Sequence, residues 1–179
     1  MLLTEIKNCA NKISTSVIEN RRHLHSHPEL SFQEYKTSAF IKSRLDEMGI
    51  PWQPIANTGV VAIIRGEISS KKVIALRADM DALPITEAND IIYCSRNNGV
   101  MHACGHDTHT ASLLGVAAIL QSVKTKFGGT VKLIFQPGEE ILPGGASLMI
   151  KEGVLQNPTP DAVIGQHVSP NIQIGRAHV

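Results

Sequence analysis

A cysteine and a histidine two residues apart are the first candidates for chemistry in this 179-residue sequence. Cys104 and His106 lie in the segment HACGHD, and on an extended backbone their side chains would project the same way. Thiolate and imidazole are preferred ligands of zinc and related divalent ions. The spacing therefore predicts two ligands of one metal ion. The alternative is a buried free cysteine beside histidines that cap the following helix.

Two neighbouring carboxylates, Glu139 and Glu140, follow the tight turn Pro137-Gly138 at the end of an apolar run. One of them could bind a metal ion while the other accepts a proton from water. A solvated acidic turn is the alternative, although carboxylates at the end of a buried strand would need a cation to compensate them. His167 follows the next apolar run, where a lone histidine could instead be structural. Taken together, these residues favour one shared metal site.

Asp79 and Asp81 follow another apolar run and leave three roles open. They could orient a ligand imidazole, contact a metal ion, or cap the turn before Pro84. A Cys104 nucleophile is disfavoured, because His106 is better placed to share an ion than to receive a thiol proton. A purely structural zinc site is the non-enzymatic alternative, and such a site would not need Glu139.

The elements that would position these side chains alternate along the chain. Helical periodicity or composition predicts helices over residues 4–24, 35–45, 107–123 and 146–152, the third capped by Asp107 or Thr108. Apolar runs predict strands at residues 60–64, 73–76, 131–135 and 162–164. This order predicts an α/β fold with a mostly parallel central sheet flanked by helices. Ligand sites in such sheets gather at the carboxyl ends of the strands, so all four groups could face one pocket.

Composition excludes several classes of function. The 17 basic and 16 acidic residues give a net charge of +1, so we expect no nucleic-acid partner. Charged residues interrupt the apolar positions of the first twenty residues, so we expect neither a signal peptide nor a membrane partner. The three cysteines show no disulfide framework, which favours a reducing, cytoplasmic location.

Five motifs in this order resemble those of the dinuclear-metal amidohydrolases, which include hippurate hydrolase, N-acyl-amino-acid amidohydrolases and hydrolases of auxin conjugates. The motifs are RRHLHSHPELSFQE, ALRADMDALPI, MHACGHDTHTASLLG, IFQPGEE with PGGASLMI, and GQHV. The resemblance runs from about residue 18 to residue 168 and implies a zinc-peptidase-like catalytic domain.

The resemblance also implies a role for individual residues. Glu139 would be the general base, and Asp81 would match an aspartate that orients a ligand. A pair of divalent ions, zinc, manganese, nickel or cobalt, would be bound by Cys104, His106, Glu140 and His167. Asp79 stands where wider relatives have a histidine ligand, which puts a direct metal role for it in doubt.

The implied reaction is hydrolysis of the amide bond of N-acyl amino acids, such as hippurate, by a metal-activated water. The substrate would be a small-molecule N-acyl amino acid or a peptide. A dipeptidase or carboxypeptidase of the same superfamily is one alternative, and an inactive metal-binding fragment is another. A homodimer is one assembly that the resemblance allows for the full-length form.

The sequence departs from the family pattern at its carboxyl end. Family members are longer, with an inserted lid or dimerisation domain and a last histidine ligand that we do not find here. We therefore expect residues 1–173 to be the amino-terminal part of the metal-binding catalytic domain, and residues 174–179 to be a non-native tail. His178, within that tail, follows no expected motif and is not assigned as the missing ligand.

Overall fold

Five strands form one central sheet with the order β1-β2-β4-β3-β5. The computed structural model describes residues 2–169. The strands are β1 (Trp52–Ile55), β2 (Gly59–Arg65), β3 (Ile68–Asp79), β4 (Gly128–Gln136) and β5 (Ala162–Gly165). Each of the four predicted strands is present. β1 and the exposed first half of β3 were not predicted, because β1 contains Pro54 and residues 69–72 are polar.

The sheet is mixed rather than mostly parallel. β3 pairs parallel with β4 and β5, as expected, while β2 pairs antiparallel with β1 and β4. Only Gly66 and Glu67 separate β2 from β3. A link of two residues is too short for a crossover, so β2 and β3 run in opposite directions. The α/β class is confirmed, and the parallel half of the sheet is the half that leads to the predicted site.

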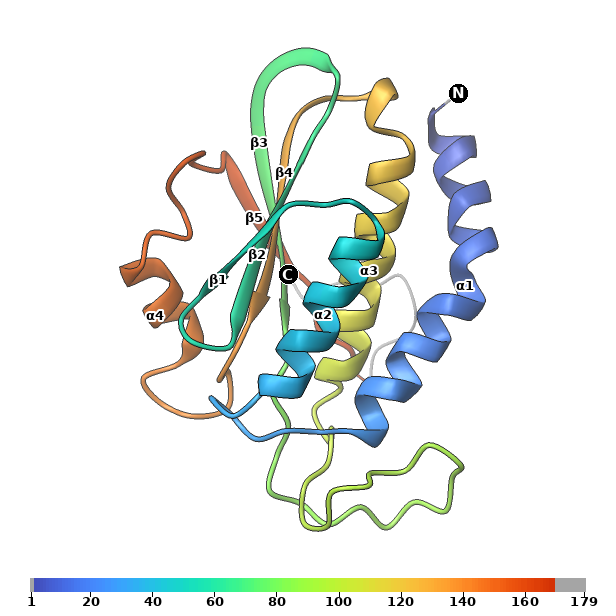
Figure 1. The fold of residues 1–179 in the computed structure, drawn as a ribbon, viewed down its shortest axis with the longest axis vertical. Coiled ribbons are helices and arrows are strands. Elements are labelled where there is room, and N and C mark those ends of the chain that lie inside the picture. The colour runs from blue at the N-terminus through green and yellow to red at the C-terminus, as the bar shows by residue number, and fades with distance from the viewer. Residues whose placement is uncertain (1, 170–179) are drawn as a thin grey trace.

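Three long helices cover one face of the sheet, and a short helix lies on the other side (Figure 1). The long helices are α1 (Leu2–Ser26), α2 (Tyr35–Glu47) and α3 (His106–Ser122), and the short one is α4 (Gly145–Lys151). A 3-10 turn, η1 (Lys124–Lys126), follows α3. α1 packs closely on α3 at Gly115, where a Cβ atom would lie 2.8 Å from Val17. Among residues 2–169, no helix combines the length and apolarity needed to cross a bilayer.

The alternation of β4 divides the core between the two faces of the sheet. Leu133 and Phe135 pack with residues of α2 and α3, whereas Ile134 packs with Met149 of α4. Lys132 also points to the α4 side and is only 2% exposed. Its ammonium group donates hydrogen bonds to three carbonyl oxygens of the segment after α4, those of Val154, Gln156 and Pro158, at 2.7, 2.8 and 2.9 Å.

The parallel strands β3, β4 and β5 all end at one edge of the sheet. Asp79, the last residue of β3, lies opposite Gln136, the last residue of β4, and Arg77 lies opposite Gly165 of β5. The segments that follow these strands carry Asp81, Glu139, Glu140 and His167. The 80–105 loop joins the end of β3 to the start of α3, so α3 begins at the same edge.

We expect Lys132→Met to destabilise the protein by about 2–4 kcal/mol, because three carbonyl groups, of which that of Val154 is buried, lose the hydrogen-bond donor that ties their segment to β4. Urea unfolding followed by circular dichroism measures the change. Lys124→Met is the matched control: its ammonium group is 3.7 Å from Glu67 and its side chain is 44% exposed, so it should shift stability by less than about 0.5 kcal/mol. Equal effects of the two substitutions would contradict this account of Lys132.

Candidate metal and catalytic site

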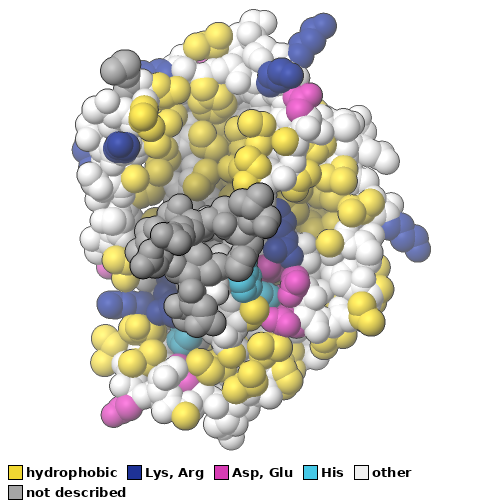
Figure 2. Space-filling model, turned by 180° about the vertical axis from the view of Figure 1, so that it is seen from behind, with side chains coloured by type: hydrophobic (Ala, Val, Ile, Leu, Met, Phe, Trp, Pro, Cys, Tyr) yellow, Lys and Arg dark blue, Asp and Glu magenta, His cyan; other side chains and the backbone are white. Residues whose placement is uncertain are grey.

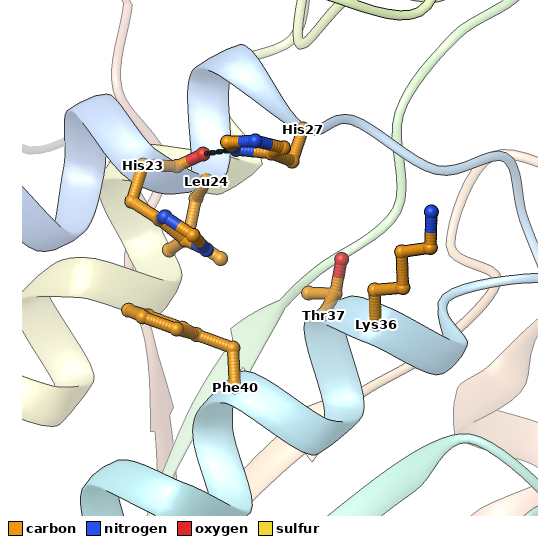
Figure 3. Close-up of a pocket in the computed structure, with 6 residues that line it drawn as sticks. All are labelled: His23, Leu24, His27, Lys36, Thr37 and Phe40. Atoms are coloured by element: carbon orange, nitrogen blue, oxygen red, sulfur yellow. Dashed lines mark hydrogen bonds between the residues drawn. The ribbon is translucent and has the colours of Figure 1, made fainter.

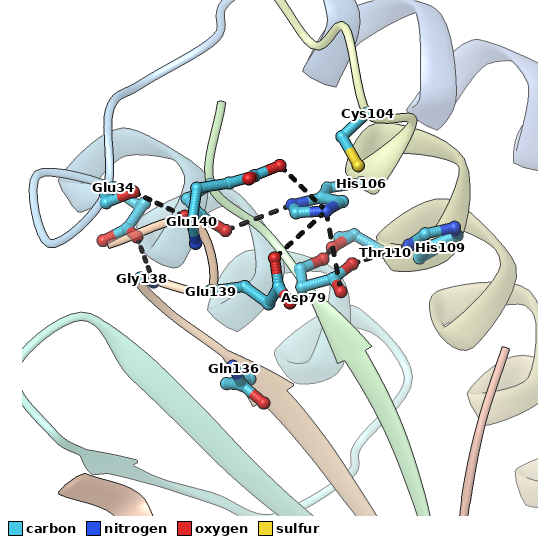
Figure 4. Close-up of polar contacts among 12 residues, drawn as sticks. Glu34, Asp79, Cys104, His106, His109, Thr110, Gln136, Gly138, Glu139 and Glu140 are labelled. Atoms are coloured by element: carbon cyan, nitrogen blue, oxygen red, sulfur yellow. Dashed lines mark hydrogen bonds and ion pairs between the residues drawn. The ribbon is translucent and has the colours of Figure 1, made fainter. Parts of the chain in front are cut away.

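Side chains from three strand ends and the start of α3 converge at this edge of the sheet. Figure 4 shows those from the ends of β3 and β4 and from the start of α3. Asp81 follows β3, Glu139 and Glu140 follow β4, His167 follows β5, and Cys104 and His106 flank the start of α3. On the face seen in Figure 2, acidic and histidine side chains gather near the middle, bordered by hydrophobic side chains. The six residues to which the resemblance assigns a role therefore lie in one region, although these roles stay predictions.

The N-cap of α3 lies two residues before Asp107 and three before Thr108, the two caps expected from the sequence. Gly105, with a φ of +87°, is the N-cap residue, and His106 is the first helical residue, so neither Asp107 nor Thr108 caps the helix. The backbone from Cys104 to His106 is therefore not extended. A Cβ atom at Gly105 would lie 2.4 Å from Val168. Glycine thus permits both the left-handed turn and the close approach of the segment after β5.

His106 is buried and presents one ring nitrogen to the acidic residues. Its Nδ1–H donates a hydrogen bond to Asp81 Oδ1 at 3.1 Å. Its Nε2 lies 3.7 Å from Glu140 Oε1 and 3.9 Å from Glu139 Oε2. With Nδ1 carrying the proton, the lone pair of Nε2 is available to a cation. A carboxylate behind a ligand histidine fixes its tautomer and orientation in this way in many metal sites.

Ligand atoms of Cys104, His106 and Glu140 all lie within 4.8 Å of one another. The Cys104 Sγ atom is also 3.9 Å from His167 Nε2. Glu140 Oε1 is buried and has no hydrogen-bond partner among residues 2–169. Burial, together with the carboxylates of Glu140, Asp79 and Glu139, raises the pKa of the Cys104 thiol to about 12. A thiol, an imidazole and an unpartnered carboxylate oxygen at such spacing fit a divalent cation.

Asp81 accepts hydrogen bonds from three separate segments around the site. Its Oδ2 accepts hydrogen bonds from Ser31 Oγ at 2.6 Å and from the backbone N–H of Glu140 at 3.0 Å. Burial alone would raise the pKa of Asp81, but these bonds and the one from His106 outweigh it and lower the pKa to about 2. Of the three roles that the sequence left open for the two aspartates, the contacts of Asp81 match the orientation of an imidazole.

Asp79 and His109 form a second pair that sequence analysis did not assign. His109 Nδ1–H donates to Asp79 Oδ1 at 2.6 Å, and His109 Nε2 accepts a hydrogen bond from the N–H of Val168 at 2.9 Å. Asp79, His106 and His109 are close enough to bind one ion, but both nitrogens of His109 already have partners. We therefore interpret His109 as an anchor for the backbone beside His167. Its only signal in the sequence is its place in HACGHDTH.

Glu139 and Glu140 differ in their access to solvent. The side chain of Glu139 is 41% exposed and that of Glu140 is 22% exposed. The two neighbouring carboxylates thus differ in exposure, although both lie within 4 Å of His106 Nε2. Glu139 can reach a bound molecule from solvent, while Glu140 lies among the other potential ligands.

The histidine-rich start of the chain makes contacts outside this site. His25 hydrogen-bonds Asp107 at 2.8 Å and Glu87 at 3.0 Å, which ties α1 to α3 and to the 80–105 loop. The hydrogen bond to Asp107 raises the pKa of His25. His23 stacks between His27 and Phe40 beside a cavity of about 210 Å³ between α1 and α2 (Figure 3). Residues 174–179, with His178, lie outside the described residues.

Comparisons with known proteins agree with the geometry. The model of peptidase family M20/M25/M40 matches residues 75–179. An N-acyl-L-amino acid amidohydrolase of Geobacillus stearothermophilus is 45% identical over 98% of this chain and 47% of its own length. An N-acetyl-L-cysteine deacetylase of Bacillus subtilis is 48% identical over 95% of the chain and 41% of its own length. Thermostable carboxypeptidase 2 of Saccharolobus solfataricus is 45% identical over 97% of this chain and 44% of its own length.

A solved structure agrees with the fold. The Bacillus subtilis YXEP protein, described as a dinuclear metal binding peptidase from the M20 family, superposes with a TM-score of 0.85 at 44% identity. The alignment covers 92% of this chain and 46% of that protein. The chain thus spans less than half the length of each of these relatives. From the family match, the sequence identity and the shared fold together, we conclude that this chain belongs to peptidase family M20/M25/M40.

Proposed function

We propose that this protein is a metal-dependent amidohydrolase that hydrolyses the amide bond of N-acyl amino acids. The observation that carries the proposal is the close group of Cys104, His106 and Glu140 beside the half-exposed carboxylate of Glu139. The named activities of the amidohydrolase and deacetylase relatives support the substrate class. In this proposal residues 1–173 belong to a metal-binding catalytic domain.

The proposed ligands of a pair of divalent cations are Cys104, His106, Glu140 and His167. The dinuclear description of the YXEP protein supports the number of ions. Bound divalent ions would lower the pKa of a water molecule and polarise the amide carbonyl. Asp81 keeps the proton of His106 on Nδ1 and so keeps Nε2 free to bind. Asp79 is the partner of His109 and of Arg77 rather than a ligand in this proposal.

Glu139 is the proposed general base. Its exposed carboxylate accepts a proton from the attacking water and then delivers that proton to the leaving amine. The products are a carboxylic acid and a free amino acid. Glu140 follows the same turn but is less exposed, and its Oε1 has no hydrogen-bond partner among residues 2–169. In this proposal Glu140 therefore binds a cation while Glu139 transfers the proton.

A carboxypeptidase is the second candidate, because the Saccharolobus solfataricus relative with that name is 45% identical to this chain. The two candidates differ in substrate, since a carboxypeptidase cleaves a peptide bond and the amidohydrolase cleaves an acyl group from a single amino acid. Parallel assays with N-acetyl amino acids, hippurate and dipeptides decide between them.

We expect Glu139→Gln to lower the rate of N-acyl amino acid hydrolysis by about 10²–10⁴-fold, because the amide cannot accept the proton. Cation binding should stay within about threefold of the unsubstituted protein. Release of free amino acid, measured with manganese or zinc, reports the rate, and cobalt titration reports binding.

Glu140→Gln is the counterpart of that variant and should weaken cation binding itself. Glu67→Gln, at an exposed carboxylate, is the control for loss of one charge. Full activity in Glu139→Gln would contradict the assignment of the general base, and unchanged cobalt binding in Glu140→Gln would contradict the assignment of the ligand.

We expect the affinity for the cation that binds Cys104 to rise about tenfold per pH unit between about pH 7 and pH 9, because binding of that cation must displace the one Cys104 proton. Below a thiol pKa of about 12, the protonated form competes with the cation, so raising the pH favours binding. Cobalt–thiolate charge-transfer absorption follows the titration. Cys104→Ser should lose this absorption and show a shallower pH dependence. A pH-independent affinity in the unsubstituted protein would speak against thiolate ligation.

A further inference from the structure

Glu34 is a fully buried carboxylate that joins three separate segments of the chain. It is 0% exposed and directly precedes α2. Its Oε1 accepts hydrogen bonds from the N–H of Phe32 at 2.9 Å and from the N–H of Gly138 at 2.7 Å. Its Oε2 accepts a hydrogen bond from Thr58 Oγ1 at 2.6 Å. Figure 4 shows Glu34 beside the turn that carries Glu139 and Glu140.

Other contacts also restrict the turn at Gly138, which Glu34 holds through a hydrogen bond. Gly138 has a φ of +52°, and a Cβ atom there would lie 2.3 Å from the ring of Phe32. The carbonyl of Gly138 accepts a hydrogen bond from the N–H of Gly145 at 2.8 Å. The peptide groups on both sides of Gly138 are therefore fixed, one by Glu34 and the other by the start of α4.

Other residues of the 29–34 segment contact the opposite side of the same site. Ser31 Oγ donates to Asp81 Oδ2, and the carbonyl of Glu29 accepts a hydrogen bond from the N–H of Ala82 at 2.8 Å. Asp81 in turn accepts from the N–H of Glu140. One short segment before α2 thus supports both the end of β3 and the turn after β4.

We propose that Glu34 is a positioning residue, which sets the place of Glu139 and Glu140 by holding the N–H of Gly138. This role rests on the proposed function of those two carboxylates. Glycine has no side chain that could fix a left-handed turn, so the turn depends on the hydrogen bonds to its peptide groups. A charged acceptor makes stronger hydrogen bonds than a neutral one. A shift of about 1 Å at a reacting group can cost about 100-fold in rate.

Glu29 provides a matched control in the same segment. Its carboxylate accepts hydrogen bonds from the N–H of Lys36, the N–H of Thr37 and the hydroxyl of Thr37, at 3.1, 2.8 and 2.9 Å. All three donors belong to the first turn of α2. Glu29→Ala therefore removes as many hydrogen bonds as Glu34→Ala, but none of them reaches the turn after β4.

The first experiment compares hydrogen exchange in the metal-free protein. Glu34→Ala should speed exchange about tenfold or more in the peptide that covers residues 137–142, whereas Glu29→Ala should speed exchange only in α2. Glu34→Gln should restore most of the protection, because its amide oxygen can still accept from Gly138 and Phe32. Unchanged exchange at residues 137–142 in folded Glu34→Ala overturns the proposal, whatever the metal result.

The second experiment measures cobalt affinity and hydrolysis in the same variants. Glu34→Ala should weaken cobalt binding about tenfold or more and lower kcat more than it raises KM. Glu34→Gln and Glu29→Ala should each stay within about threefold of the unsubstituted protein. Equal losses in Glu29→Ala and Glu34→Ala would show a merely structural role and overturn the proposal, as would a failure of Glu34→Gln to rescue.

Two further outcomes are decisive. If Glu34→Ala does not fold, Thr58→Val replaces it, since this change removes one hydrogen bond from Glu34 Oε2; an unchanged cobalt affinity and exchange rate in that variant would overturn the proposal. If the unsubstituted protein binds no cobalt, the proposed function fails, and hydrogen exchange alone then decides whether Glu34 holds the turn.

Discussion

The buried carboxylate of Asp81 is the contact on which the site depends. It joins the end of β3 to α3 through His106, to the segment before α2 through Ser31, and to the turn after β4 through the N–H of Glu140. Each of these partners lies 25 to 59 residues from Asp81 in the chain. A carboxylate buried in this way is tolerable because Ser31, His106 and the N–H of Glu140 donate hydrogen bonds to it. The same bonds place the imidazole and a glutamate where a cation would need them.

The charges around this contact are balanced unequally. Asp79 is compensated by Arg77 and by the hydrogen bond from His109, and Asp81 by His106. Glu140 Oε1 is buried, lies 3.7 Å from His106 Nε2 and has no hydrogen-bond partner among residues 2–169, and burial together with the neighbouring carboxylates works against ionisation of Cys104. One divalent cation would reverse both effects, because it would pair with the carboxylate and favour the thiolate. The charges around Cys104 and Glu140 thus support the same place for a cation as the ligand geometry does.

Sequence patterns predicted the elements that have a strong period or a long apolar run. The helices and the four core strands fall in this class, and so does the gathering of Cys104, His106, Glu140 and His167 at one sheet edge. β1 and the exposed half of β3 escaped because hydrogen bonding to a neighbour, rather than apolar pattern, makes them strands. The sequence did not reveal the contacts of Ser31, Glu34 and His109 for a different reason. Their partners lie far along the chain, as Glu34 and Gly138 do at 104 residues, and no local pattern encodes such a pairing.

Anomalous scattering from a crystal grown with zinc or manganese would locate the cations that we propose to bind at this site. We expect density peaks that include one within bonding distance of Cys104 Sγ, His106 Nε2 and a carboxylate oxygen of Glu140. Absence of a peak at these atoms, or a peak between Asp79 and His109 in its place, would show that the proposed ligands are wrong.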